Sequence, residues 1–474
     1  MLWTLAIRHL LVRPGRAAVL LLGFAIGVAV MIVLLSVGDA MLEQSRDIAL
    51  VGGGELTVLP EGVDVEALRT GGMTGLFFGI DRARFVTRQL LGGPRQAGVV
   101  RAVSPVLEQK LLVIRTRDRL WTVRAGGELP SATARLGSAV PVLAGEWRDS
   151  PLDAQWLAPA SQALYDELDR FHVPTVRDST WAEWHYFNVV VGPSEWWYIT
   201  YLIGGDLPGG RWGGRVLATH RRPDGSHHRF ETTMPASAVQ FDTTAADVTL
   251  GANTVRQVDG VYRIEGRSEG ATFGFTLTPA PRRYFPPVEL RDDRLSSGYV
   301  VPALVAVVSG RFCDGSSCQD VVNAAAYHDH NWGVWRDVTW AWGSGQGASH
   351  ALLYGGVVRA GEQATAAPFF FALVDSLGVQ QVYRFEGVER IGSRPVPGRP
   401  GVSAPDSLRI LAVRRADTLR VTVAIEAADA TPSGGPGIPQ WFLQMRGHWT
   451  LRGRAAGVPV ADSGRGFFEV WQPR

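Results

Sequence analysis

The sequence predicts a mainly β protein that follows a single N-terminal membrane helix. The 474 residues include 55 Gly and 16 Trp, and many short apolar runs end at Gly, Pro or Asp-Gly, as strands joined by tight turns do. One apolar stretch near the N-terminus is long enough to cross a bilayer. Hydrophobic residues make up 46% of the chain and charged residues 19%, which indicates a globular protein with a sizeable core. A net charge of +2 without a basic block excludes nucleic acid as an expected partner.

The apolar stretch runs from Ala17 to Val37, and residues 17–38 are the predicted transmembrane helix. Its flanks carry opposite charges: Arg8, Arg13 and Arg16 before it, Asp39 and Glu43 after it. The positive-inside rule therefore places residues 1–16 in the cytoplasm and the bulk of the chain on the extracytoplasmic side. The alternative is a cleaved signal peptide, whose apolar core spans only about 7–15 residues. Because this stretch is longer, we expect a retained single-pass anchor in the cytoplasmic membrane.

The N-terminal residues resemble those of a transporter family. The motifs are Leu5–Leu10, Gly38–Gln44 and Glu55–Pro60. They are similar to the first membrane helix and first extracytoplasmic strand of MacB/FtsX-type ABC transporter permeases. The further membrane helices of that family do not follow, so the resemblance implies a permease fragment reused as an anchor and stalk. It also makes an ABC-type transporter a candidate partner.

Residues 39–174 join this anchor to the main module and have a mixed pattern. They predict a helix at Asp81–Leu91, strands at Lys110–Thr116 and Leu120–Arg124, and an amphipathic segment at Pro151–Asp169. Pro174 ends that segment. We therefore expect the main module to begin at residue 175.

The main module opens with an aromatic hairpin. Glu183–Asn188 and Glu195–Thr200 are two strand-like runs around a turn at Gly192–Ser194. Strand alternation places Trp184, Tyr186 and Asn188 on one face. Further turns at Asp224-Gly225, Asp259-Gly260 and Asp314-Gly315 continue the rhythm, which is typical of a sandwich or barrel.

The two cysteines, Cys313 and Cys318, flank the last of these turns. A β-hairpin places such residues opposite each other, and an oxidising compartment would join them. We therefore predict a disulfide, with two free thiols as the alternative if the hairpin geometry misses the required separation.

Three motifs of the main module resemble one family. They are Glu195–Tyr198, Tyr327–Gly333 and Gly464–Glu469. Together they resemble the AttH and carotenoid 1,2-hydratase (hydroxyneurosporene synthase) family over about residues 180–474. The resemblance implies two tandem lipocalin-like β-barrel domains, with a pocket for an apolar molecule near their contact. We expect these domains at residues 175–345 and 346–474.

The motif Tyr327–Gly333 is the predicted site. On a strand, Tyr327, Asp329 and Asn331 share one face, and His328, His330 and Trp332 share the other. A carboxylic acid in an apolar pocket has a raised pKa and can protonate a C=C bond, and indole faces stabilise the resulting cation. By similarity to the hydratases, His330 and Trp332 match site positions. On the following strand Tyr354 matches as well, but Gly356 stands where a carboxylate is expected.

The predicted site therefore has two groups of residues. The catalytic candidates are Asp329, His330, Tyr327 and Tyr354. The substrate-binding candidates are His328, Asn331, Trp332, Trp340, Trp342, Trp197 and Tyr198.

Two other interpretations of the histidine motif stay open. Polar side chains at a strand end often form a buried hydrogen-bonded knot that serves structure alone. A metal site is the second, with His350 as a third ligand beside His328 and His330. Zinc needs three or four ligands and no carboxylate is obviously placed, so we expect no metal and no cofactor.

The sequence thus predicts a membrane-anchored, lipocalin-like protein that binds a hydrophobic small molecule, an isoprenoid, carotenoid or other lipid. If it is an enzyme, it is a hydratase-like hydro-lyase or a cyclase acting on a C=C bond. The alternatives are a non-catalytic lipid-handling protein beside an ABC-type export system, and a structural envelope protein.

Overall fold

The computed structural model describes most of the chain. The described residues are 14–50, 58, 80–136 without 94, 97 and 118, 150–151, and 169–473 without 292–294, 336–337, 360–368 and 434–439. The strand predicted at Glu55–Pro60 and the amphipathic segment predicted at Pro151–Asp169 lie almost entirely outside them. The described chain divides into two compact units, residues 1–92 with 96–158 and residues 93–95 with 159–474.

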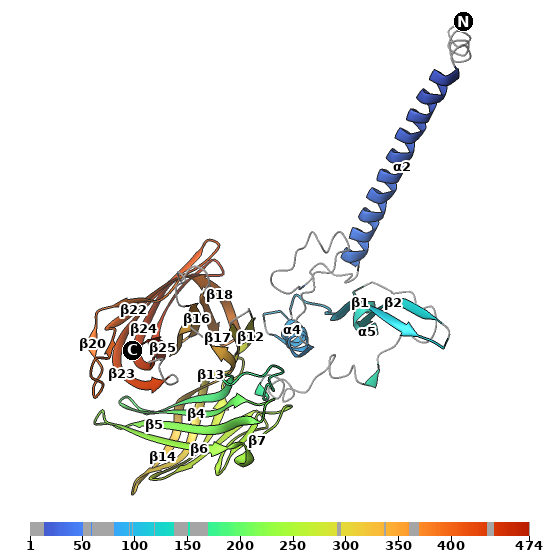
Figure 1. Cartoon of the computed structure of the whole chain (residues 1–474). Coiled ribbons are helices and arrows are strands. Elements are labelled where there is room, and N and C mark those ends of the chain that lie inside the picture. Colours follow the sequence, from blue (N-terminus) through green and yellow to red (C-terminus); the bar gives the residue numbers. More distant parts are fainter. Residues whose placement is uncertain are drawn as a thin grey trace. The chain divides into compact units, whose positions relative to one another are not determined.

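The first unit begins with the long helix α2 (Pro14–Leu50) (Figure 1). Its segment Pro14–Val37 has the length and apolar composition needed to cross a membrane, as does a signal sequence. The helix covers the predicted residues 17–38 and continues to Leu50, while its role as a retained membrane anchor and its orientation stay predictions.

The rest of the first unit is small. The predicted helix at Asp81–Leu91 is α4 (Ile80–Gly92), and the two predicted strands are β1 (Val106–Arg115) and β2 (Leu120–Glu128), which pair antiparallel. The short helix α5 (Pro130–Arg135) follows them and has proline at its start, where a missing N–H costs nothing.

The second unit begins with a twelve-stranded antiparallel sheet in the order β6-β5-β4-β3-β14-β13-β11-β10-β9-β8-β7, with β12 paired to β13. Two meanders therefore meet where β3 pairs with β14, and the sheet curls into a barrel that stays open between β6 and β7. Its elements are β3 (Ala182–Gly192), β4 (Glu195–Asp206), β5 (Arg211–Arg221), β6 (His227–Pro235), η2 (Ala236–Ala238), β7 (Val239–Phe241), β8 (Asp247–Leu250), β9 (Asn253–Val258), β10 (Val261–Ser268), β11 (Ala271–Pro279), β12 (Phe285–Arg291), β13 (Leu295–Asp314) and β14 (Ser317–Trp335).

A nine-stranded antiparallel sheet follows, in the order β18-β17-β16-β15-β25-β24-β23-β22-β19, and the pairing of β18 with β22 closes it into an up-and-down barrel. This is the barrel architecture predicted from the sequence. Its strands are β15 (Val338–Gly347), β16 (Ala351–Arg359), β17 (Phe369–Asp375), β18 (Gly378–Phe385), β19 (Glu389–Ile391), β22 (Ser407–Arg414), β23 (Asp417–Ser433), β24 (Gln440–Ala455) and β25 (Val458–Pro473), with the separate pair β20 (Arg394–Pro395) and β21 (Ser403–Ala404).

Two local predictions are confirmed. The aromatic hairpin is β3–β4, which pairs antiparallel around the predicted turn. Cys313 and Cys318 are register partners in the β13–β14 hairpin and form a disulfide. The chain passes from the first sheet to the second between Trp335 and Val338, and the domain boundary near residue 345 stays a prediction.

Three apolar clusters hold the second unit together. One fills the first barrel, around Phe187, Trp197 and Tyr262, and one fills the second, around Tyr354, Phe371 and Trp449. The third joins side chains of both sheets. Strand β14 therefore has one face in the first barrel and the other toward the second sheet, so residues 326–330 are buried without interruption.

Candidate functional site

Strand β14 divides the predicted site residues between two environments. Tyr327, Asp329 and Asn331 lie together on the face toward the second sheet, as the alternation predicted. His328 and His330 lie on the opposite face, inside the first barrel. The candidate catalytic residues therefore do not form one site.

On the first of these faces, Asp329 accepts two hydrogen bonds from its own strand. The Tyr327 hydroxyl donates to its Oδ2 at 2.7 Å, and the Asn331 amide donates to its Oδ1 at 2.6 Å. The indole of Trp342, from β15 in the second sheet, donates to the Tyr327 hydroxyl at 2.9 Å. Asp329 is thus held by neutral groups, which fix its orientation without neutralising its charge.

A second carboxyl group, that of Glu469, lies on the second sheet and faces the strands β3 and β14 of the first. Asp329 pairs in register with Tyr186 on β3, and Glu469 on β25 pairs with Trp342 and Gln444. The Tyr186 hydroxyl donates a short hydrogen bond to Glu469, and Gln444 Nε2 donates to the Tyr186 hydroxyl at 3.1 Å. We call Asp329 and Glu469 the carboxyl pair.

Burial raises the pKa of both members of the carboxyl pair. The pKa of Asp329 rises to about 6, although the hydrogen bonds from Tyr327 and Asn331 oppose the rise. The pKa of Glu469 rises to about 8, because the charge of Asp329 adds to the effect of burial, against the hydrogen bond from Tyr186. At neutral pH the pair therefore holds one ionised and one protonated carboxyl group, the arrangement that separates a base from an acid.

Apolar and aromatic side chains of the third cluster surround the carboxyl pair. Trp184 contacts Trp335 at 4.8 Å between ring centroids, and Trp335 lies 6.4 Å from Trp340. These three tryptophans are half-buried and lie where the chain crosses from one sheet to the other. The cluster itself includes Tyr198, Phe285, Tyr299, Trp342, Leu353, Phe370 and Phe467.

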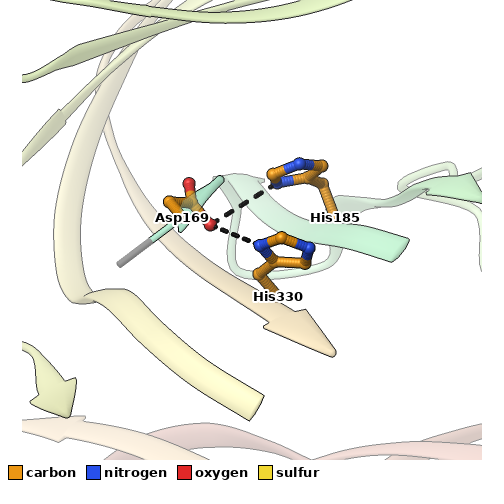
Figure 2. A group of neighbouring side chains, drawn as sticks. All are labelled: Asp169, His185 and His330. Atoms are coloured by element: carbon orange, nitrogen blue, oxygen red, sulfur yellow. Dashed lines mark hydrogen bonds and ion pairs between the residues drawn. The ribbon is translucent and has the colours of Figure 1, made fainter. Parts of the chain in front are cut away.

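The other face of β14 carries a buried group of ionisable residues. His330 contacts a carboxylate at each ring nitrogen, Asp169 Oδ1 at 2.8 Å and Glu183 Oε1 at 2.7 Å. His328 Nε2 lies 3.1 Å from Asp169 Oδ2. Figure 2 shows Asp169 with His185 and His330, whose rings both direct a nitrogen toward the same carboxylate oxygen. We call this group the histidine cluster: Asp169, His172, Glu183, His185, His328 and His330.

The pKa values of the two carboxylates in the histidine cluster move in the opposite direction from those of the carboxyl pair. Burial raises the pKa of Asp169, but the charges of His328 and His185 outweigh it and leave that pKa well below its usual value. Burial also raises the pKa of Glu183, but the hydrogen bonds from His172 and His330 outweigh burial and leave that pKa below its usual value. For His330, the two carboxylates overcome burial and raise the pKa to about 9.

This cluster corrects the expectation that no carboxylate lies near the histidines. Asp169 and Glu183 both do, and both are buried. His350, the predicted third metal ligand, lies away from the cluster. It pairs with Asp462 in the second barrel, at 3.1 Å from Nδ1 to Oδ2. Glu183 contacts His172 and His330, whereas Glu195 contacts His220 elsewhere in the first barrel.

Three other predicted residues lie apart from the carboxyl pair. Tyr354 is buried in the core of the second barrel, and its hydroxyl has no hydrogen-bond partner among the described residues. Trp197 lies in the core of the first barrel, stacked on His220 at 4.4 Å. Trp332 stacks on His172 at 3.6 Å, on the histidine face.

Two other predicted residues, Trp340 and Tyr198, lie on the side of the carboxyl pair, and Gly356 stands where a carboxylate was expected. Trp340 packs edge-on against Trp471, with ring centroids 3.9 Å apart, where the chain crosses from the first sheet to the second. Tyr198 lies in the third cluster with Tyr186, and burial raises the pKa of Tyr198 well above its usual value. Gly356 has no space for the expected carboxylate, because a Cβ there would lie 2.0 Å from the ring of Phe369.

Sequence reasoning missed Glu469 and Tyr186 at the carboxyl pair, and it missed four members of the histidine cluster: Asp169, His172, Glu183 and His185. Two signals were present, since Glu469 ends the motif Gly464–Glu469 and alternation had already placed Tyr186 on a face with Asn188. Asp169 had no signal, because it lies outside the β module and reaches the histidines only through the tertiary fold.

No protein-family model matches the chain, and no curated protein matches it in sequence. Among solved structures, the chain is similar to an AttH protein from Nitrosomonas europaea (18% identity, 64% of this chain and 96% of the other, TM-score 0.46). It is also similar to kievitone hydratase from Nectria haematococca (12% identity, 61% and 88%, TM-score 0.44) and to CghA (11% identity, 66% and 97%, TM-score 0.46). These identities and TM-scores are low, and the AttH-like resemblance stays a prediction.

Proposed function

We propose that this chain binds an apolar, isoprenoid-type molecule between its two β barrels and hydrates or cyclises one of its C=C bonds by acid catalysis. The carboxyl pair is the observation that supports the proposal. It offers an acid and a base of different pKa in an apolar environment, and general acid–base catalysis needs both near the working pH.

In hydration, the protonated Glu469 gives its proton to one alkene carbon, so the O–H bond breaks as a C–H bond forms from the π electrons. A carbocation remains on the neighbouring carbon. A water molecule attacks it, and ionised Asp329 takes the proton that this water loses. The product is an alcohol, and return of the proton from Asp329 to Glu469 restores the pair.

In cyclisation Glu469 again protonates an alkene carbon, and Asp329 again acts as the base. A second double bond of the substrate attacks the cation in place of water, and Asp329 removes a proton from carbon. The third cluster supplies aromatic rings, among them Trp342 and Tyr299, which pack edge-to-face with their centroids 5.1 Å apart. Such faces stabilise a nearby cation by about 0.5–2 kcal/mol each.

The chemistry of the surroundings supports an uncharged, apolar substrate. The carboxyl pair lies among aromatic and aliphatic side chains of the third cluster, and among the described residues the charges that act most on its pKa values are those of its own members and of His328 and His330. A charged substrate would lose its hydration there without compensation. The half-buried Trp184, Trp335 and Trp340 add apolar surface where the chain crosses from one sheet to the other.

We further propose that α2 is retained as a single-pass anchor, with the β barrels on the extracytoplasmic side. The Cys313–Cys318 disulfide supports this side, because such bonds persist in oxidising compartments. An ABC-type transporter stays a predicted partner that rests on the N-terminal resemblance.

The test is product analysis in isotopic water. The full chain, purified in a mild detergent, is incubated with a panel of acyclic isoprenoid polyenes in deuterium oxide or oxygen-18 water. Hydration adds one solvent deuterium at carbon and one solvent oxygen to the product. Glu469→Gln and Asp329→Asn should abolish the incorporation of solvent isotope while the polyene still binds. Glu195→Gln, which changes a carboxylate in the first barrel, is the control. Binding without any labelled product would leave a lipid-handling protein, and full activity in Asp329→Asn would contradict the assigned base.

A further inference from the structure

The histidine cluster contains one side chain that its hydrogen bonds do not explain. His185 is 2% exposed, and neither of its ring nitrogens has a hydrogen-bond partner among the described residues. Its Nδ1 lies 3.7 Å from Asp169 Oδ1, beyond hydrogen-bond distance. A buried imidazole with two unpaired nitrogens costs free energy, so something must compensate for it.

The position of His185 indicates what compensates. It lies directly opposite His330 on the paired strands β3 and β14, and the two rings stack at 4.0 Å between centroids. Figure 2 shows both rings presenting a nitrogen to Asp169. His185, His330 and Asp169 each offer one ligand atom, and these atoms lie within 4.8 Å of one another. Ligands at about 2.0–2.2 Å from a tetrahedral metal lie roughly 3.3–3.6 Å apart, between the 2.8 Å and 3.7 Å separations found here.

We propose that Asp169 Oδ1, His185 Nδ1 and His330 Nδ1 bind a divalent transition metal ion, zinc in the first instance. Two imidazoles and one carboxylate are a donor set that suits zinc and its first-row neighbours. The metal takes the place of the proton on His330 Nδ1 and gives His185 a partner.

The surroundings of the three ligands have the form that metal sites require. Glu183 accepts a hydrogen bond from His330 Nε2 at 2.7 Å, and a metal-bound histidine characteristically donates its other N–H to a carboxylate. Glu183 is itself fixed by the backbone N–H of His172, at 2.9 and 3.0 Å. The second oxygen of Asp169 accepts from the Tyr262 hydroxyl at 2.7 Å and contacts His328 at 3.1 Å, so its first oxygen is left for the metal.

The site would clamp the segment before the first barrel onto the barrel wall. Asp169 precedes β3 in the chain, whereas His185 and His330 belong to adjacent strands. The metal site lies on the opposite face of β14 from the carboxyl pair, so the inference does not depend on the proposed function.

The experiment measures metal in the full chain, purified without a histidine tag and in a mild detergent. Elemental analysis should find about one zinc or equivalent ion per chain, removable by a chelator and restored by zinc chloride. Cobalt chloride added to the metal-free protein should give the visible absorption of a nitrogen- and oxygen-bound Co²⁺.

His185→Gln is the decisive variant, because His185 makes no hydrogen bond whose loss would unfold the protein. Its affinity for Zn²⁺ should fall by at least about 100-fold, and that of Glu183→Gln by about 10–100-fold. His350→Gln, which changes a histidine paired with Asp462, should bind as the native protein does. Circular dichroism verifies that each variant is folded.

The inference is overturned if the native chain neither contains nor takes up zinc or cobalt. It is also overturned if folded His185→Gln keeps native affinity, or if His350→Gln loses the metal equally.

Discussion

The two faces of strand β14 are equally buried and electrostatically opposite. Toward the second sheet, Asp329 contacts tyrosine and asparagine, and burial raises its pKa to about 6. Inside the first barrel, Asp169 contacts imidazoles, and its pKa is lowered despite complete burial. The chemistry of the partners, and not burial alone, therefore decides which carboxyl group keeps a proton. One face is suited to proton transfer and the other to holding charge.

The largest effect expected concerns the acid. Glu469→Gln keeps the size of the side chain and its place opposite Tyr186 but removes the transferable proton. Turnover should fall by about 10²–10⁴-fold, the usual contribution of a general acid, with little change in ligand affinity. Steady-state kinetics and binding measured on the same preparation check this. Unchanged turnover would remove the functional distinction between the two faces.

On the histidine face, the largest expected effect is on stability. Asp169→Ala leaves the imidazoles of the histidine cluster without their shared carboxylate, and breaking one side of a buried ion pair costs about 3–5 kcal/mol. The free energy of unfolding, measured with urea, should fall by this amount. A loss below about 1 kcal/mol would show that this network does little to hold the fold.

Glu469 should contribute a measurable part of the pH dependence of stability, beside Asp329 and His330. Its pKa is raised by burial and by Asp329, with Tyr186, Tyr198 and Tyr327 as the other titratable groups around it. Because the folded pKa of about 8 lies above the ordinary value of 4.5, its stabilising contribution is complete below pH 4.5 and is lost as the pH rises through about 8. The melting temperature should therefore decline over this range in the native chain and decline less in Glu469→Gln. Parallel curves for the two proteins would contradict the raised pKa.

A smaller effect is expected at Tyr186. Tyr186→Phe removes the hydroxyl that donates to Glu469 and so withdraws a group that favours the ionised form. The pKa of Glu469 should rise further, and the alkaline decline of turnover should move to higher pH. The cost in stability should be about 1–3 kcal/mol, since Gln444 and Asn188 lose their acceptor. A shift of the decline to lower pH would contradict the direction of this hydrogen bond.

The smallest effect is expected at Tyr354, which the sequence had placed among the catalytic residues. Its hydroxyl is buried without a hydrogen-bond partner among the described residues, so Tyr354→Phe should leave turnover within about twofold and stability within about 0.5 kcal/mol. A large loss of activity would return this residue to the site.

Much of the fold could be predicted because its signals are local. Alternation and turn residues gave the β3–β4 hairpin, the disulfide hairpin and the two faces of β14. The composition of Ala17–Val37 gave the N-terminal apolar helix.

The candidate site could be predicted only in part, because it is assembled from distant strands. Asp329 and Glu469 come from different barrels, and only the contact between the sheets brings Tyr186 to Glu469. Asp169 reaches the histidines from outside the β module. Strand periodicity shows which residues share a face, but it does not show what that face meets.

The most direct test of this account is the protonation state of Glu469. Infrared difference spectra of the full chain, recorded across a pH titration, report the carbonyl stretch of a protonated carboxyl group. We expect such a band at pH 7 in the native chain, lost as the pH rises through about 8 and absent from Glu469→Gln. A native spectrum at pH 7 without that band would mean that Glu469 is ionised, and the carboxyl pair would then contain no acid.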